Sequence, residues 1–171
     1  MIKAVIFDIG DVVVRPKYGK LYKRAMKKID AVLGGLVGEK NALRQAVIKQ
    51  RRAFRVNGDV MAVIRKLQAN GYMTPSITNT PLKAFEEDTE MKGGGPFHGI
   101  VSAPDIGLRK SDRRVYEAAL RRFRLRPEEC VFVDDKEENL APARVMGMRT
   151  VLFKKARQLK DELHRYGVRV G

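Results

Sequence analysis

The chain has 171 residues, 44% of them hydrophobic and 7% aromatic, which suffices for one packed domain with at most a small insert. No run of about 18 uncharged apolar residues is present, so we expect no membrane span. Met1-Ile2-Lys3 leads directly into a strand-like run, so we expect no signal peptide. The single cysteine, Cys130, cannot form an intramolecular disulfide, which fits a reducing cytoplasm. We therefore expect a soluble, cytoplasmic α/β protein.

The net charge is +15, and most of the excess lies in one early segment. Residues 15–55 contain thirteen basic side chains and only two acids, Asp30 and Glu39, for a net charge of +11. Three interpretations stay open: a solvated surface, a collector of an anionic substrate, or a nucleic-acid contact patch. Few aromatic residues accompany the charges, which weakens the case for stacking on single-stranded bases. A nucleic-acid partner is therefore an alternative and not the favoured reading.

The first part of the chain predicts a strand followed by helices. Lys3–Asp8 is a continuous β-branched and aromatic run that ends on an acid, as a buried parallel strand does. Apolar residues at helical spacing predict helices over residues 21–33, 39–55 and 60–70. We expect Asp59 to be the N-cap of the third helix and Gly71 to lie just past its end.

Beyond Gly71, strand and helix patterns alternate. Strands are predicted over residues 72–78, 98–102, 130–133 and 150–153. Helices are predicted over residues 81–91, 111–123, 139–146 and 157–166, with Ser111 as the cap of the second. Pro75 weakens the first of these strands, because proline has no amide hydrogen to donate. Strands separated by helices imply an α/β fold with a Rossmann-like parallel sheet and helices on both faces.

Polar side chains gather where the predicted strands end. Asp8 ends the first strand, Thr78-Asn79 the second, and Asp134-Asp135 the fourth, while Lys110 lies in a loop that opens a helix. In an open α/β sheet, ligands bind beyond the carboxyl ends of the strands. Three carboxylates with a hydroxyl and a lysine suit a hard divalent cation and a phosphoryl group. The pattern therefore predicts a site for phosphate chemistry at this edge.

These residues resemble a known family. Four runs match, in order and spacing, the motifs of the haloacid dehalogenase-like (HAD) hydrolase superfamily: Val5–Val12, Ser76–Thr80, Gly107–Tyr116 and Val131–Asn139. The resemblance covers about residues 1–14 and 72–155. The sequence is most similar to the subset that contains sugar-1-phosphate phosphatases and the N-terminal phosphatase domain of soluble epoxide hydrolase. It implies a core of residues 1–14 and 72–171, with a small basic helical cap, residues 15–71, inserted after the first strand.

The resemblance also implies a reaction and its residues. The expected activity is Mg²⁺-dependent hydrolysis of a small phosphorylated substrate, with Asp8 as the nucleophile that forms an aspartyl-phosphate. The implied Mg²⁺ ligands are Asp8, the backbone carbonyl of Gly10, Asp134 and Asp135. The implied substrate-binding residues are Thr78, Asn79, Lys110 and Asp11, of which Thr78 and Lys110 also assist the chemistry.

Gly10 departs from the family pattern. Most phosphatases of this family have a second Asp two residues after the nucleophile, and such a general acid is typically worth about 10²–10⁴ in rate. Asp11 could replace it, the substrate could need little acid, as sugar-1-phosphates and acyl phosphates do, or binding could be the protein's main task. We favour the second explanation. The 2-haloacid dehalogenases also lack this acid, but they use no metal, and the pair Asp134-Asp135 favours Mg²⁺.

Overall fold

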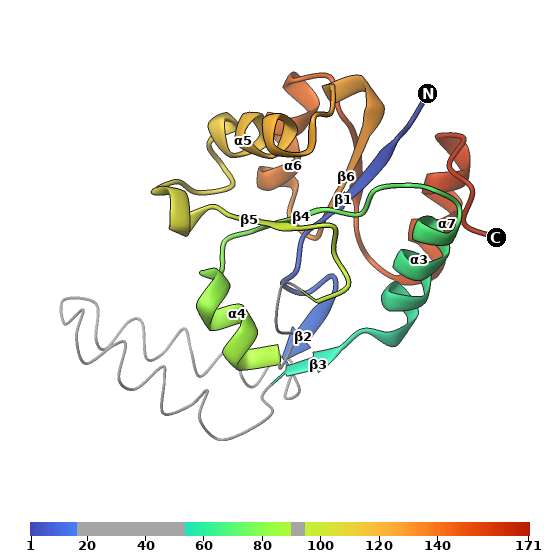
Figure 1. The fold of residues 1–171 in the computed structure, drawn as a ribbon. Helices are drawn as coiled ribbons and strands as arrows, with labels where there is room; N and C mark the ends of the chain where they lie inside the picture. Colours follow the sequence, from blue (N-terminus) through green and yellow to red (C-terminus); the bar gives the residue numbers. More distant parts are fainter. Residues whose placement is uncertain (17–53, 90–94) are drawn as a thin grey trace.

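The computed structural model describes residues 1–16, 54–89 and 95–171, and Figure 1 shows their arrangement. The elements are, in chain order, β1 (Ala4–Phe7), β2 (Val14–Pro16), β3 (Phe54–Val56), α3 (Gly58–Ala69), β4 (Ser76–Thr78), α4 (Leu82–Thr89), β5 (Ile100–Ser102), η2 (Pro104–Ile106), α5 (Arg113–Phe123), η3 (Pro127–Glu129), β6 (Cys130–Asp134), α6 (Glu137–Val145), β7 (Arg149–Leu152) and α7 (Ala156–Arg165). Within these residues, no helix is long and apolar enough to cross a membrane.

Five strands form one parallel sheet in the order β5-β4-β1-β6-β7. The chain builds outward from β1 through β4 to β5 and then returns to the other side of β1 with β6 and β7. This reversal makes β1 the switch point of an open α/β sheet, where ligands bind beyond the carboxyl ends of the strands. The register pairs Phe7 with Val133, so Asp8 and Asp134 leave the sheet at the same level. The predicted parallel α/β fold is confirmed.

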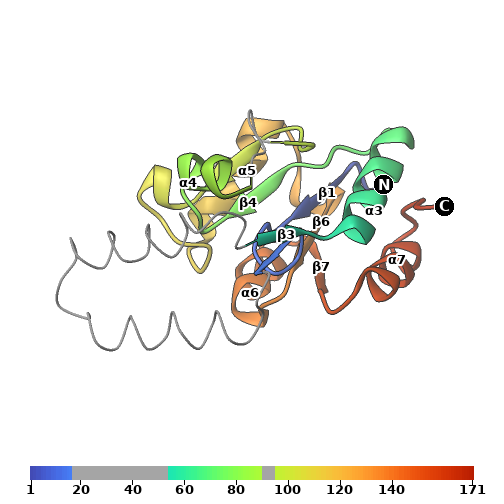
Figure 2. The same cartoon turned by 90° about the horizontal axis from the view of Figure 1, so that it is seen from below.

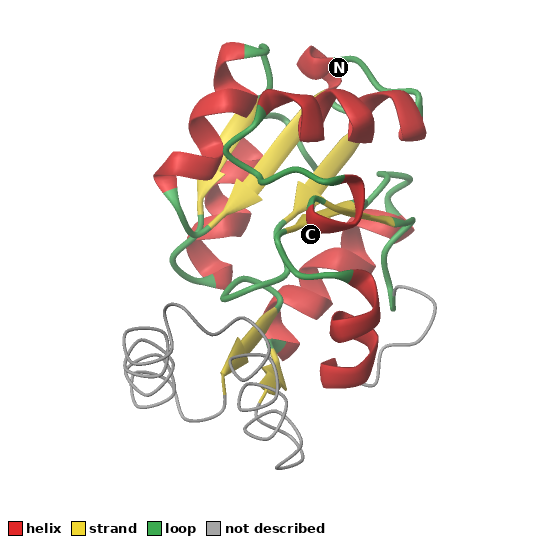
Figure 3. Cartoon of the chain, turned by 90° about the vertical axis from the view of Figure 1, so that its left-hand side faces the viewer, coloured by secondary structure: helices red, strands yellow, loops and turns green. Residues whose placement is uncertain are grey.

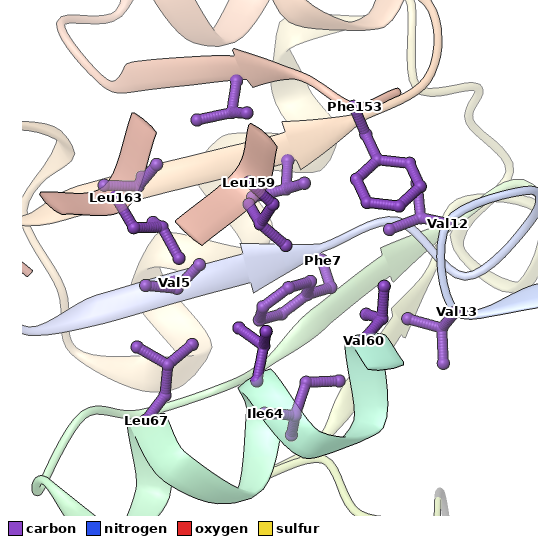
Figure 4. Packing of buried hydrophobic residues seen from close by; sticks show 14 of the residues in the cluster. Val5, Phe7, Val12, Val13, Val60, Ile64, Leu67, Phe153, Leu159 and Leu163 are labelled. Atoms are coloured by element: carbon purple, nitrogen blue, oxygen red, sulfur yellow. The ribbon is translucent and has the colours of Figure 1, made fainter. Parts of the chain in front are cut away.

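Side chains of β1 alternate between two apolar layers. Val5 and Phe7 belong to the cluster that α3 and α7 cover, and Figure 4 shows them between these helices. Ala4 and Ile6 belong to the cluster that α5 and α6 cover on the other face. Figures 1 and 2 show α3 beside α7, with α5 and α6 across the sheet. The central strand is therefore buried on both faces, which explains its unbroken apolar sequence.

Helix α3 belongs to the core layer, although the sequence analysis grouped it with the cap. Its buried face consists of Val60, Val63, Ile64 and Leu67, all part of the cluster that contains Val5 and Phe7 of β1. Burial of each such side chain is worth about 1.5–3 kcal/mol. Residues 17–53 of the expected cap, which include the helix over 21–33 and most of that over 39–55, lie outside the described residues. That a cap is inserted after the first strand, over residues 15–71, stays a prediction, while α3 within that range packs with the core.

The expected N-cap of α3 was wrong by two residues. Asn57, not Asp59, caps this helix, because its Oδ1 accepts a hydrogen bond from the amide of Val60 at 3.4 Å. Its Nδ2 donates to the carbonyl of Val12 at 3.2 Å, and its amide donates to the carbonyl of Val13 at 2.8 Å. These bonds tie the start of α3 to the loop that follows β1. Gly71 lies just past the helix with φ +82°, as expected.

Three further local expectations need correction. Phe54 and Arg55 lie in β3, which pairs with β2 outside the main sheet (Figure 3), and not in a helix that extends to residue 55. The cap of α5 is Asp112, whose carboxylate accepts from the amide of Arg114 at 3.0 Å, and not Ser111. The strand expected over 72–78 is regular only in β4, and Met73 forms an isolated bridge with Ala4 on the other side of Pro75.

Candidate active site

Asp8 lies directly after β1, and its carboxylate is held inside the protein. The residue is only 5% exposed, and its amide donates to the carbonyl of Val133 at 2.8 Å. Burial raises the pKa of this carboxyl, the neighbouring carboxylates of Asp134 and Asp135 add to the rise, and Lys110 opposes it, so that the pKa goes from 3.8 to about 7. Asp8 is therefore an acid whose charge depends on a nearby cation.

Lys110 supplies that cation. Its Nζ donates to the Asp8 carboxylate and to Asp134 Oδ2, the second at 2.8 Å, and its side chain is almost fully buried. Burial alone would lower the pKa of Lys110, but the two carboxylates outweigh it and raise the pKa above 10.5. The lysine therefore stays an ammonium between the ends of β1 and β6.

Asp134 is the last residue of β6 and is fully buried. Its Oδ1 accepts from the amide of Lys136 and from Asn139 Nδ2, both at 2.9 Å. Asn139 in turn accepts, at its carbonyl, the hydroxyl of the buried Tyr116. The sequence reasoning noted Asn139 only as part of a motif and did not single out Tyr116. Asn139 could have been found from the sequence, because an asparagine five residues after a buried acid is a recognisable signal. No short-range pattern indicates Tyr116.

Asp8, Asp134 and Asp135 each offer an oxygen within 4.8 Å of the others. Carboxylate oxygens are ligands that hard divalent cations such as Mg²⁺ prefer. The donor set therefore fits the expected cation. Gly10, whose carbonyl was expected to be a ligand, lies beside this group, since a Cβ built on it would be 3.9 Å from Asp8 Oδ2.

Thr78 is the last residue of β4, the neighbour of β1, and Asn79 follows it directly. The buried Oγ1 of Thr78 accepts from the amide of Thr80 at 3.0 Å, which leaves its hydroxyl proton for another acceptor. Asn79 Oδ1 accepts from the amide of Lys110 at 2.9 Å. Asn79 therefore connects β4 to the loop that carries the lysine.

Asp11 is the expected site residue that the structure does not bring into the acidic cluster. It has a left-handed backbone with φ +59°, its amide donates to the carbonyl of Val14 at 2.8 Å, and its carbonyl accepts from Arg15 Nε at 3.2 Å. The clustered acids among the described residues are Asp8, Asp134 and Asp135 alone. Asp11 lies on the turn between β1 and β2.

The family model for haloacid dehalogenase-like hydrolases matches residues 36–147. The chain belongs to this family. It is 27% identical over 145 residues to the sesquiterpene phosphatase astK of Aspergillus oryzae, covering 82% of this chain and 74% of that protein. It is 23% identical over 150 residues to bifunctional epoxide hydrolase 2 of Rattus norvegicus, covering 85% of this chain. It is 31% identical over 91 residues to the glyceraldehyde 3-phosphate phosphatase of Pyrococcus furiosus, covering 52% of this chain.

The matched region spans only 27% of the rat protein and 38% of the archaeal phosphatase. Two solved structures agree with the fold. A HAD-like family hydrolase from Porphyromonas gingivalis matches with a TM-score of 0.73 at 18% identity, covering 99% of each chain. A HAD family enzyme from Bacteroides thetaiotaomicron, solved with magnesium and inorganic phosphate, matches with a TM-score of 0.68 at 16% identity, covering 90% of this chain and 95% of that chain. At these identities the structures support the shared fold.

Proposed function

We propose that the protein is a Mg²⁺-dependent phosphatase that hydrolyses a small phosphorylated metabolite through an aspartyl-phosphate on Asp8. The observation that carries the proposal is the ion pair of Lys110 with both Asp8 and Asp134 beside a third carboxylate, Asp135. A nucleophilic carboxylate, a cation for the phosphoryl oxygens and oxygen ligands for a metal then lie at one edge of the sheet. The family and its phosphatase relatives support the same reaction class.

The first step transfers the phosphoryl group to the protein. Asp8 attacks phosphorus, a bond forms between its carboxylate oxygen and phosphorus, and the bond to the substrate's leaving oxygen breaks. Lys110 neutralises charge on the phosphoryl oxygens, and the hydroxyl of Thr78 donates a hydrogen bond to the same group. Asn79 holds Lys110 in place, because its Oδ1 accepts a hydrogen bond from the backbone amide of Lys110. Water then attacks phosphorus, which releases inorganic phosphate and restores Asp8.

Asp8, Asp134, Asp135 and the carbonyl of Gly10 would hold the Mg²⁺ ion. When bound, Mg²⁺ screens the repulsion between the Asp8 carboxylate and a phosphate dianion. Lys110 also screens this repulsion, since its ammonium group lies between the carboxylates of Asp8 and Asp134. Asn139 and the amide of Lys136 orient Asp134 for this role.

A panel of phosphoesters assayed with Mg²⁺, with EDTA, and with Mg²⁺ restored tests this function. We expect phosphate release that EDTA abolishes and Mg²⁺ restores. A panel of 2-haloacids serves as the comparison, because dehalogenation needs no metal. Halide release that persists in EDTA, with no phosphate release from any ester, would contradict the proposed function.

The cytoplasmic location stays a prediction from the single cysteine.

A further inference from the structure

A pocket of about 430 Å³ lies at the amino ends of the central strands, at the edge of the sheet opposite Asp8. Its walls come from the residues before β1, the residues that end or follow α3 and α5, and Arg169 after α7. Small-molecule sites typically enclose about 300–1,000 Å³. The pocket is therefore large enough for a ligand of its own, separate from the candidate active site.

Apolar side chains form the floor of this pocket. Met73, Phe123 and Leu125 line it, and each is partly buried against the core cluster under α5. The ring of Phe123 is closely held, since a Cβ on Gly99 would lie only 3.0 Å from it and the guanidinium of Arg122 lies 5.6 Å from its centroid. The floor is therefore preformed, which reduces the ordering cost when a ligand binds.

The charged side chains that line the pocket, among the described residues, are all basic: Lys3, Arg124 and Arg169. Lys3 Nζ lies 2.8 Å from Glu129 Oε1, so part of its charge is already neutralised. The backbone of Arg169 is fixed beside the floor, because its amide donates to the hydroxyl of Tyr72 at 3.1 Å. Guanidinium groups bind carboxylates through paired N–H donors. Two arginines above an apolar floor are therefore complementary to an anion with an apolar body.

Arg124 occupies a backbone position that favours glycine. It follows α5 with φ +54°, and the amides of Arg124 and Leu125 donate to the carbonyls of Arg121 and Leu120 at 3.3 and 3.0 Å, the pattern of a Schellman motif. A residue with a Cβ is strained in this left-handed conformation. Stability of the helix end alone would therefore favour glycine, whereas binding of an anion gives a reason for the guanidinium.

We propose that this pocket binds a small amphipathic anion, an apolar chain that ends in one carboxylate. Arg124 and Arg169 bind the carboxylate, and the chain lies on the apolar floor of Met73, Phe123 and Leu125. The pocket and Asp8 lie at opposite ends of β1, so both sites can be occupied at once. The proposal does not depend on the proposed phosphatase function.

Titration of the ¹⁵N-labelled protein with three probes tests the ligand class. Octanoate has the chain and the charge, octanamide has the chain alone, and acetate has the charge alone. We expect only octanoate to bind in calorimetry and to shift the amide signals of Met73, Arg124 and Arg169, with no change at Asp8 and Lys110. Equal affinity for octanamide or acetate, no binding of octanoate, or shifts confined to Asp8 and Lys110 would overturn the proposal.

Arg124→Gly tests the site itself. It should raise the Kd for octanoate by about 5-fold, the upper end for a partly exposed ion pair. The Tm of the free protein should not fall, because glycine adopts the left-handed backbone without strain. Arg121→Ala is the matched control, since it removes the same charge from an exposed position on α5 that does not line the pocket. It should keep the wild-type Kd.

Arg169→Gln gives a second measurement at the other arginine, and its Kd should rise as that of Arg124→Gly does. This variant decides the question if Arg124→Gly fails to fold. Equal increases of the Kd in these variants and in Arg121→Ala would mean that octanoate responds only to the overall positive charge, which contradicts a built site. An unchanged Kd in both Arg124→Gly and Arg169→Gln would contradict it as well.

Discussion

Asn79 Oδ1 accepts a hydrogen bond from the amide of Lys110 at 2.9 Å, across 31 positions of the chain. Asn79 directly follows β4, and Lys110 lies in the loop before α5. The bond acts on the backbone of Lys110, so it determines where the side chain begins on its path to Asp8. Asn79 is therefore a positioning residue for the lysine.

Asn79→Ala should lower kcat/KM by roughly 2- to 13-fold, the equivalent of one hydrogen bond worth about 0.5–1.5 kcal/mol. Asn79→Asp keeps an acceptor oxygen and should retain more activity than Asn79→Ala. Asn70→Ala is the matched control, because that amide bonds to the carbonyl of Arg169, a partner that is not part of the site. Steady-state kinetics with an ester that the wild type hydrolyses gives kcat/KM for each variant. Equal losses in Asn79→Ala and Asn70→Ala would mean that the effect is only structural.

Asp8→Asn should abolish phosphate release while the fold is retained. The amide has nearly the same shape but is not a competent nucleophile. Burial and the neighbouring acids raise the pKa of Asp8 to about 7 despite Lys110, so the native fold holds its charged form at a disadvantage, and Lys110 keeps Asp134 as a partner. We expect the Tm to change by less than about 4 °C, or about 1 kcal/mol for a domain of this size. Asp161→Asn on the exposed side of α7 is the control. Wild-type turnover in Asp8→Asn would remove Asp8 from the mechanism.

The strands and their terminal acids are predictable because the information is local. A β-branched run that ends on Asp8, and another that ends on Asp134, indicate buried strands whose ends meet at one edge of the sheet. The residue types there also indicate the chemistry. Such a pattern does not show which side chains, far apart in the sequence, lie within bonding distance of one another. The ion pairs of Lys110 with both acids join residues 102 and 24 positions apart, and only the folded chain reveals them.

The errors arose where a tertiary contact overrides local preference. Asn57 and Asp59 are both good caps, but only Asn57 also bonds to the carbonyl of Val12, which decides where α3 begins. Phe54 and Arg55 continue a helical pattern, yet they pair with Pro16 and Arg15 in a small antiparallel ladder. The apolar face of α3 was visible in the sequence, but the sheet that it covers was not.

Glu129 should make the protein's stability depend on pH in the acid range. Hydrogen bonds from the Arg126 and Lys3 side chains and from the Arg126 amide lower the pKa of this carboxyl from 4.5 to about 2. The folded state therefore binds the proton more weakly than the unfolded state does. The resulting stability is full above pH 4.5 and is lost as the pH falls toward 2.

Urea unfolding of the wild type and of Glu129→Gln between pH 2 and 6 measures this contribution. The difference between their free energies of unfolding should grow as the pH rises through the window from about 2 to 4.5. Glu128→Gln is the control, because its exposed carboxylate makes one ion pair with Arg126 at 3.3 Å. Its profile should follow that of the wild type. Parallel profiles for the wild type and Glu129→Gln would contradict the assignment.

The basic segment, residues 15–55, should make substrate binding sensitive to salt. Its net charge of +11 attracts an anionic ester, and added salt screens that attraction, so KM should rise with ionic strength. A nucleic-acid partner predicts another pattern. The logarithm of the DNA-binding constant then falls, for each tenfold rise in salt concentration, by about 0.9 for every phosphate neutralised on duplex DNA. Gel-shift titrations alongside the kinetics distinguish the two. Tight duplex binding that persists in Asp8→Asn, with no ester turned over, would favour a binding protein over an enzyme.

Asn139 should control the affinity for Mg²⁺ without contacting the ion. Its Nδ2 holds Asp134 Oδ1 at 2.9 Å, and removal of such an outer partner typically costs about 10–100-fold in metal affinity or activity. Asn139→Ala should therefore raise the Mg²⁺ concentration for half-maximal activity by about this factor. Tyr116→Phe is the matched control, because it removes the hydroxyl that bonds to the Asn139 carbonyl and leaves every contact of Asp134 in place. It should lower the Tm, since a buried hydrogen bond is lost, and keep the wild-type Mg²⁺ dependence. Activity and Tm are each titrated with Mg²⁺ for both variants. If Asn139→Ala loses stability but keeps the wild-type Mg²⁺ midpoint in both titrations, Asn139 acts only on the fold, and Asp134 does not depend on it to hold the cation.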